Sequence, residues 1–389
     1  MDFYIMDDRI VETLFAKLIF GLDDAILWLW SLQKEEIMDN LSYHKQLSVE
    51  NTEKLRTILQ EFPQFIRDYF RGLEPTTTAK TRISYAYDLK VFFFFLQQRN
   101  SYFAHKEIKD FVVSDLELLE PVDIEEYLEF LKVYQDPNGK IRTNDERGIH
   151  RKLSSLRSFY LYYSKRKMIK NNPTIVVDLP KLHQKQIIRL DPDEVAELLD
   201  LVEFGGKDLT GMKKVYYEKN KLRNLAIFTL LLGTGIRVSE CVGLDLEHVD
   251  FKNNRIKIIR KGGKEDYVYF GDEVEKALMD YIEQSRNQIQ AVQGHEGALF
   301  LSIQRKRMSV KAIENLVSDT AKQVTRFKHI TPHKLRSTYG TNLYKETGDI
   351  YLVAEVLGHN DVNTTRKHYA ALDEDRKRQA AKVVRMREE

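Results

Sequence analysis

Cysteine is almost absent from this chain of 389 residues. The single cysteine, Cys241, excludes an internal disulfide and a metal site built from several cysteines, and it suits a reducing intracellular compartment. Long apolar runs are also missing, because no run reaches the roughly 18 residues that a membrane helix needs. The opening MDFYIMDDR lacks the basic region of a signal peptide. With 42% hydrophobic and 31% charged residues, the sequence predicts a soluble globular protein with no membrane partner.

Acidic and basic residues are spread unevenly although the net charge is only +2. Residues 1–40 carry nine acidic and three basic residues, a sum of −6, so the rest of the chain carries about +8. The stretch 252–264 holds six Lys or Arg and no acid, and 304–311 holds four more. Such runs are usually solvated surface, and contact with phosphate groups is the alternative.

Changes in composition divide the chain into four predicted parts. Residues 1–45 form an acidic helical extension that holds both tryptophans and suits a packing or capping role. Residues 46–175 show helical patterns, and 176–187 reads as an extended linker. A second, mostly helical domain follows at 188–389, and its end, 373–389, predicts an amphipathic helix.

Three features organise the first domain. A long helix is predicted over 78–100, Asp123 is a candidate cap for the next helix, and QDPNGK at 135–140 is a turn. The stretch 149–170 then predicts a helix with one apolar face. Basic residues are interleaved on that helix, and the sequence predicts that they lie on a DNA backbone: Arg151, Lys152 and Arg157.

The second domain is expected to begin with a helix capped by Asp191, with Pro192 as its first residue. Its one β signal is RIKIIRKGGKEDYVYFG at 255–271. Two short β runs flank Gly262-Gly263 there, which predicts a hairpin.

The segment TGIRVSE at 234–240 follows an apolar helix and invites a dinucleotide-binding interpretation. That interpretation fails because Val238 occupies the third glycine position and the preceding run suits a helix better than a strand. What remains is Arg237, a cation just past a glycine-rich turn, with Glu240 near enough to hold it.

A helix start is predicted at TPHKLR, residues 331–336, with Thr331 as cap and Pro332 in the first turn. His333 and Arg336 are three residues apart and leave one face near the helix N-terminus. That arrangement suits a phosphate group. A lone His-x-x-Arg pair is also common in purely structural settings.

In VAEVLGHND, Gly358 is predicted to end a helix in the left-handed conformation, with His359 directly beyond it. A short helix starting at Asn363 or Thr364 would carry Tyr369. Taken singly, His359 suits a surface histidine and Tyr369 a packing residue.

The order of these motifs over roughly residues 60–375 resembles the tyrosine recombinases, which include Xer proteins and the phage and conjugative-transposon integrases. The resemblance implies that Arg237 and Arg336 clamp the scissile phosphate and that Glu240 braces the first arginine. It also implies that His333 and His359 occupy the two histidine positions of the family.

The resemblance further makes Tyr369 the nucleophile and Lys261 the general acid, with Lys264 as the alternative lysine and as a DNA contact. Such chemistry needs no metal and no ATP, because guanidinium groups stabilise the phosphate charge and the phosphotyrosine keeps the bond energy. The chain departs from the common pattern at three places. Its spacing from His359 to Tyr369 is one residue longer, Ser337 stands where many members have histidine, and 204–220 exceeds the minimal length.

The implied fold is mainly α: a helical core-binding domain and a mostly α catalytic domain with a small antiparallel sheet, closing as a C-shaped clamp on DNA. The implied partners are double-stranded DNA with an inverted-repeat site and three further copies of the chain, forming a tetramer on two sites. The resemblance leaves room for an accessory protein, either a translocase or a directionality factor, and it implies a bacterial cytoplasmic protein associated with the nucleoid. Two alternatives stay open: an inert DNA-binding regulator on the same fold and a type IB topoisomerase.

Overall fold

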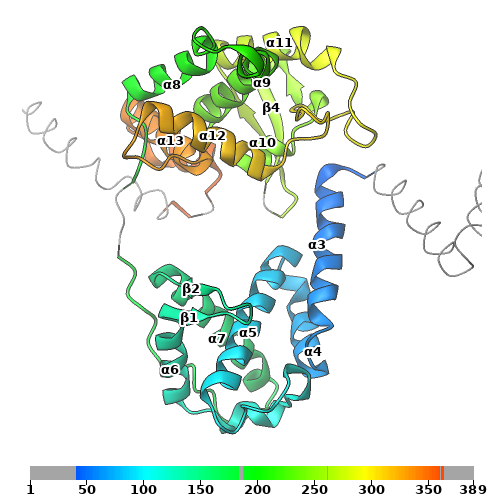
Figure 1. The fold of residues 1–389 in the computed structure, drawn as a ribbon, viewed down its shortest axis with the longest axis vertical. Coiled ribbons are helices and arrows are strands. Elements are labelled where there is room, and N and C mark those ends of the chain that lie inside the picture. The colour runs from blue at the N-terminus through cyan, green and yellow to red at the C-terminus, as the bar shows by residue number, and fades with distance from the viewer. Residues whose placement is uncertain (1–40, 184–186, 261, 360, 363–389) are drawn as a thin grey trace, which may run out of the picture. The chain divides into compact units, whose positions relative to one another are not determined.

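The structure, a computed structural model, describes residues 41–183, 187–260, 262–359 and 361–362 (Figure 1). They divide into two compact units, one within Ser42–Lys185 and one that starts after it, and the division falls inside the predicted linker. Each unit is considered by itself. Most of the predicted extension, the linker residues 184–186 and the predicted tail lie outside the described residues.

The first unit consists of five α-helices, three short 3-10 helices and one small hairpin (Figure 1). The elements are α3 (Tyr43–Leu59), α4 (Gln64–Leu73), η1 (Glu74–Thr76), α5 (Ala79–Arg99), η2 (Ile108–Asp110), η3 (Val113–Leu118), α6 (Pro121–Lys132), β1 (Val133–Gln135), β2 (Ile141–Thr143) and α7 (Glu146–Lys165).

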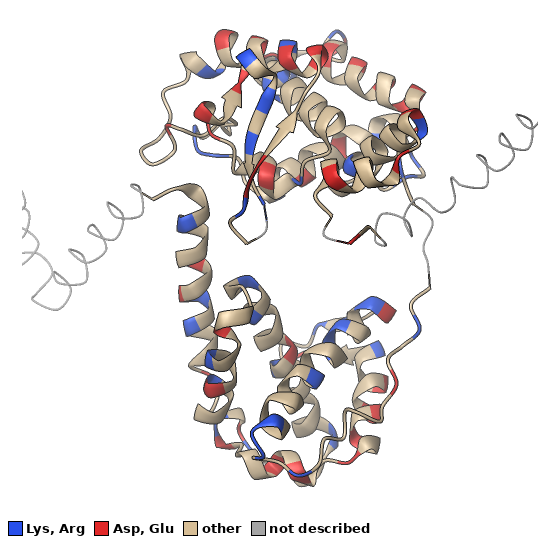
Figure 2. Cartoon of the chain, turned by 180° about the vertical axis from the view of Figure 1, so that it is seen from behind, with Lys and Arg blue, Asp and Glu red and all other residues tan. Residues whose placement is uncertain are grey.

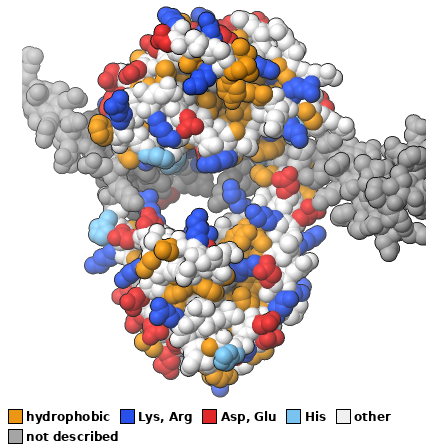
Figure 3. All heavy atoms as spheres, in the orientation of Figure 1, with side chains coloured by type: hydrophobic (Ala, Val, Ile, Leu, Met, Phe, Trp, Pro, Cys, Tyr) orange, Lys and Arg blue, Asp and Glu red, His pale blue; other side chains and the backbone are white. Residues whose placement is uncertain are grey.

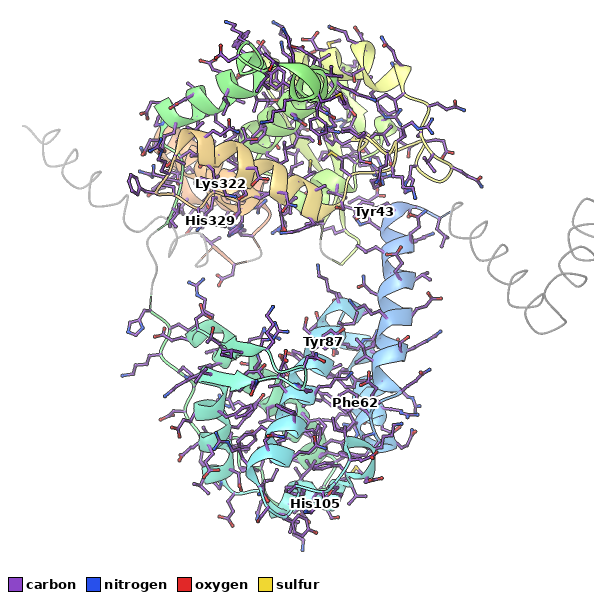
Figure 4. All side chains as sticks on the ribbon, in the orientation of Figure 1. Tyr43, Phe62, Tyr87, His105, Lys322 and His329 are labelled. Carbon is purple, nitrogen blue, oxygen red and sulfur yellow. The ribbon has the colours of Figure 1, made fainter. Side chains whose placement is uncertain are left out.

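Aromatic rings fill the core of this unit. Phe62, between α3 and α4, is fully buried, and its ring lies 6.4 Å from both Phe70 and Phe93 (Figure 4). Phe159 of α7 makes an edge contact with Tyr69 at 5.1 Å. Burial of such large rings is the main source of stability for a small helical unit.

The helix starts agree with the sequence in part. α5 begins after Thr78, whose side chain accepts from the Thr81 amide at 3.3 Å. The prediction that Asp123 caps the next helix is confirmed, with Asp123 as the third residue of α6, because the helix starts at Pro121. Asp123 sits in the first turn and accepts from the Glu120 amide at 2.8 Å, so its carboxylate still satisfies an N-terminal donor.

The predicted turn at 135–140 connects two strands that the sequence did not reveal. β1 and β2 pair antiparallel with Gln135 opposite Ile141. Three residues per strand are too few for a period-2 pattern to be recognised, which is why only the turn was predicted.

The second unit is mostly helical around a three-stranded antiparallel sheet of order β3-β4-β5 (Figure 1). Its elements are α8 (Pro192–Phe204), α9 (Gly211–Thr234), α10 (Val238–Val242), η4 (Leu246–His248), β3 (Val249–Asp250), η5 (Phe251–Asn253), β4 (Arg255–Ile259), β5 (Glu265–Tyr269), α11 (Asp272–Gln284), η6 (Arg286–Gln288), α12 (Val310–Val324), α13 (Pro332–Thr347) and α14 (Ile350–Leu357). The mainly α fold with a small antiparallel sheet, and the hairpin around Gly262-Gly263, are confirmed.

Helix α9 forms the centre of this unit, and residues 226–231 in its C-terminal half are all buried. It packs against α8, α11 and α13. The sequence of such a helix is a continuous apolar run and not an amphipathic pattern. Because α9 is fixed by this packing, the glycine-rich turn at its end has a fixed position too. None of the described helices is long and apolar enough to cross a membrane.

The start of the second unit agrees with its sequence. Asp191 is the cap residue of α8 and Pro192 is the first residue of the helix. The Lys328 ammonium lies 2.8 Å from Asp191 and 2.5 Å from Glu194. This hydrogen bond with Lys328 lowers the pKa of the Asp191 carboxyl, and it ties the segment before α13 to the first turn of α8.

Candidate active site

The turn after α9 places Arg237 at the start of α10. Gly235 ends α9 with a φ of 62°, in the left-handed region. A Cβ at Gly235 would also lie 2.4 Å from Cδ1 of Tyr339, so both the backbone conformation and the packing require glycine. The chain then turns so that Arg237 becomes the cap residue of α10.

Glu240 holds Arg237 through two hydrogen bonds. Its side chain is only 3% exposed, and it accepts from the Arg237 amide at 2.7 Å and from Nη1 of Arg237 at 2.8 Å. The Arg237 side chain is 38% exposed. One edge of the guanidinium is therefore fixed by a buried carboxylate while part of the group still faces solvent.

Arg336, the second predicted clamp residue, is 4% exposed. Its Nη1 donates to the carbonyl oxygen of Gly235 at 2.5 Å, and its Nη2 donates to that of Leu357. A guanidinium on α13 thus joins the C-terminal ends of α9 and α14. Buried carbonyl groups at helix ends need such donors.

The end of α14 follows the predicted geometry. Gly358 has a φ of 61°, and the amide of His359 donates to the Ala354 carbonyl at 2.9 Å, which closes the helix. Nη2 of Arg237 lies 3.3 Å from the Gly358 carbonyl oxygen. The structure therefore brings Arg237, Arg336 and the turn that carries His359 together, from three separate parts of the sequence.

His333 is the second residue of α13, and its side chain is exposed. The cap residue Thr331 is in the predicted place, but its hydroxyl makes no cap hydrogen bond. The half-buried Ser337 donates to the His333 carbonyl at 3.0 Å. Although His333 and Arg336 are one turn apart, His333 faces solvent and Arg336 enters the interior.

The hairpin turn between β4 and β5 carries the candidate lysines. Gly262 and Gly263 have φ values of 89° and 81°. Lys264 is exposed, and its carbonyl accepts from the Arg260 amide at 2.8 Å. Lys261, like Tyr369, lies outside the described residues, so their places in the site stay predictions.

Much of the basic run 252–264 is paired with acids from neighbouring strands. Nε of Arg255 lies 2.9 Å from Asp250, and the Lys257 ammonium lies 2.9 Å from Glu265. In this sheet the blue positions lie on β4 and the red ones on the strands beside it (Figure 2). On the visible face of each unit, acidic and basic side chains are interspersed (Figure 3).

The three basic residues of α7 differ in their surroundings. Arg151 is about half exposed and forms an ion pair with the buried Asp88. Lys152 is buried, its ammonium donates to Asn144 at 2.6 Å, and burial lowers the pKa of this lysine. The half-buried Arg157 donates to the Thr174 carbonyl at 3.1 Å. Lys152 and Arg157 therefore stabilise the interior of the unit. Of the three basic residues, only Arg151 is exposed on the surface.

One group of described residues could offer ligands to a metal ion: Asp245, Glu247 and His248. Two of the three already have structural partners. Asp245 pairs with Arg307, and Nδ1 of His248 accepts from the Asp245 amide at 3.0 Å. The group serves to hold the start of η4.

Sequence analysis missed Arg260, which connects the hairpin to the end of α14. In the sequence it is one cation of the basic run. Its position directly before Lys261 is a local signal, but its partners in α14, Val356 and Leu357, lie far away in the sequence.

The chain was compared with protein-family models, with known protein sequences and with solved structures, and all three comparisons match recombinases or integrases. The model of the phage integrase family matches residues 189–376. The chain is 33% identical to "Tyrosine recombinase XerC" from Caldanaerobacter subterraneus subsp. tengcongensis, over 86% of this chain and 89% of the relative. It is 29% identical to "Tyrosine recombinase XerD" from Staphylococcus saprophyticus, over 80% of this chain and 92% of the relative.

Solved structures share the fold. The XerH site-specific recombinase bound to a palindromic difH substrate, in a post-cleavage complex, has a TM-score of 0.58 and 20% identity, covering 78% of this chain and 80% of that one. The Tn1549 transposon integrase in complex with a circular intermediate DNA has a TM-score of 0.56 and 16% identity, covering 79% and 98%.

Proposed function

Since this chain belongs to the tyrosine recombinase family and is a site-specific DNA recombinase, we propose that Arg237, Arg336 and Tyr369 carry its strand cleavage. The observation that supports this most is the convergence of two arginines on one turn. Arg237 and Arg336 both bind the segment 357–358, directly before His359. Two guanidinium groups held by neighbouring carbonyl groups can stabilise the charge on the non-bridging oxygens of a phosphodiester.

Tyr369 supplies the nucleophile in this proposal. Its phenolic oxygen attacks the scissile phosphorus, and a histidine, His333 or His359, accepts the phenolic proton. The phosphorus–tyrosine bond forms as the bond to the 5′ oxygen breaks, which gives a covalent 3′-phosphotyrosine. Lys261 donates a proton to the departing 5′ oxygen, with Lys264 as the alternative. A 5′ hydroxyl of the partner strand then attacks the phosphotyrosine, which reverses these bond changes and rejoins the DNA. Exchange of the first pair of strands gives a Holliday junction, and exchange of the second pair resolves it. Because the phosphotyrosine keeps the bond energy, neither a metal nor ATP is needed.

The proposed substrate is double-stranded DNA with an inverted-repeat site, bound by both units as a clamp.

Four protomers act on two sites, and the tail 373–389 docks on a neighbouring protomer. Deleting residues 376–389 should therefore lower synapsis of two sites more than binding of one, and an equal loss of both would contradict the docking. The biological role in this proposal is dimer resolution in chromosome segregation, or integration of a mobile element. A bacterial cytoplasmic, nucleoid-associated location and an accessory translocase or directionality factor belong to the same proposal.

Among the predicted DNA contacts we propose Arg151 and Lys264, because their side chains reach the surface. Lys152 and Arg157 have interior partners that support a structural role instead. Salt dependence separates these roles. Affinity falls as salt rises, so the slope of log affinity against log salt is negative. For every phosphate group that a variant no longer binds, this slope should become less negative by about one.

A covalent trapping experiment tests the proposal. The wild-type chain first selects duplexes from a pool with a randomised stretch, and the selected site is then rebuilt with a nick close to the cleavage position. After cleavage, the short fragment next to the nick diffuses away and the protein stays attached through phosphotyrosine. Adduct formation that depends on the selected sequence supports the recombinase.

The other outcomes identify the alternatives. An inert regulator would bind the selected site and form no adduct. A type IB topoisomerase would form adducts on duplexes of unrelated sequence with similar rates. Either result would overturn the proposed function.

A further inference from the structure

The Arg260 side chain extends from the root of the β4–β5 turn to the end of α14. Its Nε lies 2.6 Å from Oδ2 of Asp266, its Nη1 lies 3.1 Å from the Leu357 carbonyl oxygen, and its Nη2 lies 3.2 Å from that of Val356. The side chain is 10% exposed. All three nitrogen atoms of the guanidinium therefore have acceptors, one in the hairpin and two in α14.

With these bonds from Arg260, each of the last four carbonyl groups of α14 has a donor. The carbonyls of residues 354 and 355 accept from the amides of His359 and Gly358. Those of residues 356 and 357 accept from Arg260. The C-terminal end of a helix carries partial negative charge, so a cation there is favourable. Arg260 acts as a side-chain cap supplied by another part of the chain.

Gly358 allows this close contact. A Cβ at this position would lie 2.1 Å from Nη1 and 2.3 Å from Cζ of Arg260. The guanidinium thus packs directly on the backbone of the residue before His359. A contact this close fixes the distance between hairpin and turn.

The backbone of Arg260 also closes the hairpin turn. Its amide donates to the Lys264 carbonyl at 2.8 Å, and its own carbonyl accepts from the Gly263 amide at 3.1 Å. Arg260 therefore holds the turn through its main chain and holds α14 through its side chain. The turn carries Lys264 and directly follows Arg260 in the sequence.

We propose that Arg260 is a positioning residue that fixes the general-acid turn against the end of α14, and so places the proton donor at the scissile phosphate held by Arg237 and Arg336. The inference rests on the proposed function, because it assumes that a lysine of this turn protonates the 5′ oxygen. A lysine in place of Arg260 could not span Asp266 and both carbonyl groups, because its ammonium is a single point donor on a flexible stem.

The experiment compares two nicked duplexes that carry the site selected by the wild-type chain. One has the normal 5′ oxygen at the scissile position, and the other has a bridging 5′ sulfur. Sulfur leaves without protonation, so cleavage of the second duplex does not need the general acid. The ratio of the two single-turnover rates, sulfur over oxygen, measures the contribution of the acid. Because both rates come from one preparation, the ratio does not depend on the fraction of folded protein.

Arg260→Gln should slow cleavage of the oxygen duplex by roughly 10- to 100-fold, a part of the 10²- to 10⁴-fold that general acid catalysis supplies. The sulfur duplex should be cleaved at close to the wild-type rate, so the ratio should rise by the same factor. In Arg260→Lys the ratio should rise by a smaller factor. This variant replaces Arg260→Gln as the test if Arg260→Gln folds poorly. Arg255→Gln is the matched control, because it breaks an Arg–Asp pair at the other end of β4, and among the described residues this pair shows no contact with α14. Its ratio should stay at the wild-type value.

Equal slowing on both duplexes would overturn the inference, since Arg260 would then support only the phosphate site or the fold. Normal cleavage of the oxygen duplex by both Arg260 variants would overturn it as well, as would a ratio that rises equally in Arg255→Gln. Failure of the proposed function looks different, because the wild-type chain itself would then form no sequence-dependent adduct on either duplex.

Discussion

Arg237 and Arg336 donate to neighbouring carbonyl oxygens, those of Gly358 and Leu357, although one residue follows α9 and the other lies on α13. The shared turn sets the spacing between the two guanidinium groups before any DNA is bound. Charged donors that need no rearrangement are the main requirement for stabilising a phosphate in its transition state.

Both arginines should matter for folding as well as for cleavage, for different reasons. Arg237→Ala and Arg336→Ala should each slow cleavage by about 10²- to 10³-fold, the usual loss when a donor leaves an oxyanion site. Arg336→Ala should also lower the free energy of unfolding by about 1–3 kcal/mol, because the buried Gly235 carbonyl loses its donor and the Leu357 carbonyl keeps only the one from Arg260. Arg237→Ala should lower it by a similar amount, because it leaves the buried Glu240 carboxylate without its ion-pair partner. Single-turnover cleavage and urea unfolding of the same preparations check both statements, and near-normal cleavage would remove that residue from the clamp.

Tyr369→Phe should bind DNA as tightly as the wild-type chain and form no covalent adduct. One hydroxyl contributes little to an interface dominated by phosphate contacts, yet it is the only group that the proposal allows to attack. Gel-shift titration measures binding, and denaturing gels measure the adduct. Tyr351→Phe is the control, because Tyr351 is an exposed tyrosine of α14. If the adduct persists in Tyr369→Phe and disappears in Tyr351→Phe, the nucleophile has been assigned wrongly.

The sulfur duplex also decides between the two candidate lysines. Lys261→Ala should be slow on the oxygen duplex and largely restored on the sulfur duplex, whereas Lys264→Ala should show no special restoration. A lysine that only binds the backbone should give a defect that shrinks at low salt. Restoration for Lys264→Ala alone would move the general acid three residues along the chain.

Gly358→Ala should destabilise the second unit by more than the strain of its backbone conformation alone. That strain is about 1–2 kcal/mol for a residue other than glycine, and the Cβ would in addition collide with Arg260. Gly211→Ala is the matched control, because Gly211 has a φ of 58° and open space around the Cβ position. Urea unfolding should show a larger loss for Gly358→Ala. Equal losses would mean that Arg260 moves away at little cost.

Arg151→Met should destabilise the first unit by about 2 kcal/mol at neutral pH, because it leaves the buried Asp88 carboxylate without its ion-pair partner. Burial already raises the pKa of Asp88 above its usual value. An acid whose pKa is raised by folding favours the folded state as pH falls from the folded pKa toward the unfolded value of about 3.9.

The stability difference between wild type and Arg151→Met should therefore shrink as pH is lowered through that window. Urea unfolding of both proteins between pH 7 and pH 4 measures it. Asp88→Asn in the Arg151→Met background should remove most of the pH dependence. A difference that stays constant with pH would show that Asp88 is not responsible.

Local sequence determined the features that depend on neighbours in the chain. Pro192 and Asp191 started a helix where expected, Gly358 ended one in the left-handed conformation, and Gly262-Gly263 connected two strands. These outcomes follow from backbone sterics and from donors and acceptors within a few residues. The pairing of Glu240 with Arg237 could be predicted for the same reason, because only three residues separate them.

Tertiary structure decided which cations serve the fold and which face solvent. Lys152 looked like a DNA contact, but the packing of α7 turned it inward to Asn144. Arg336 was predicted as a phosphate contact and Arg260 was one cation of a basic run, and in the structure each also binds the end of α14 from a distant element. The partner of a guanidinium group is chosen by packing in three dimensions, and the periodicity of one helix or strand contains no information about which carbonyl another element will present.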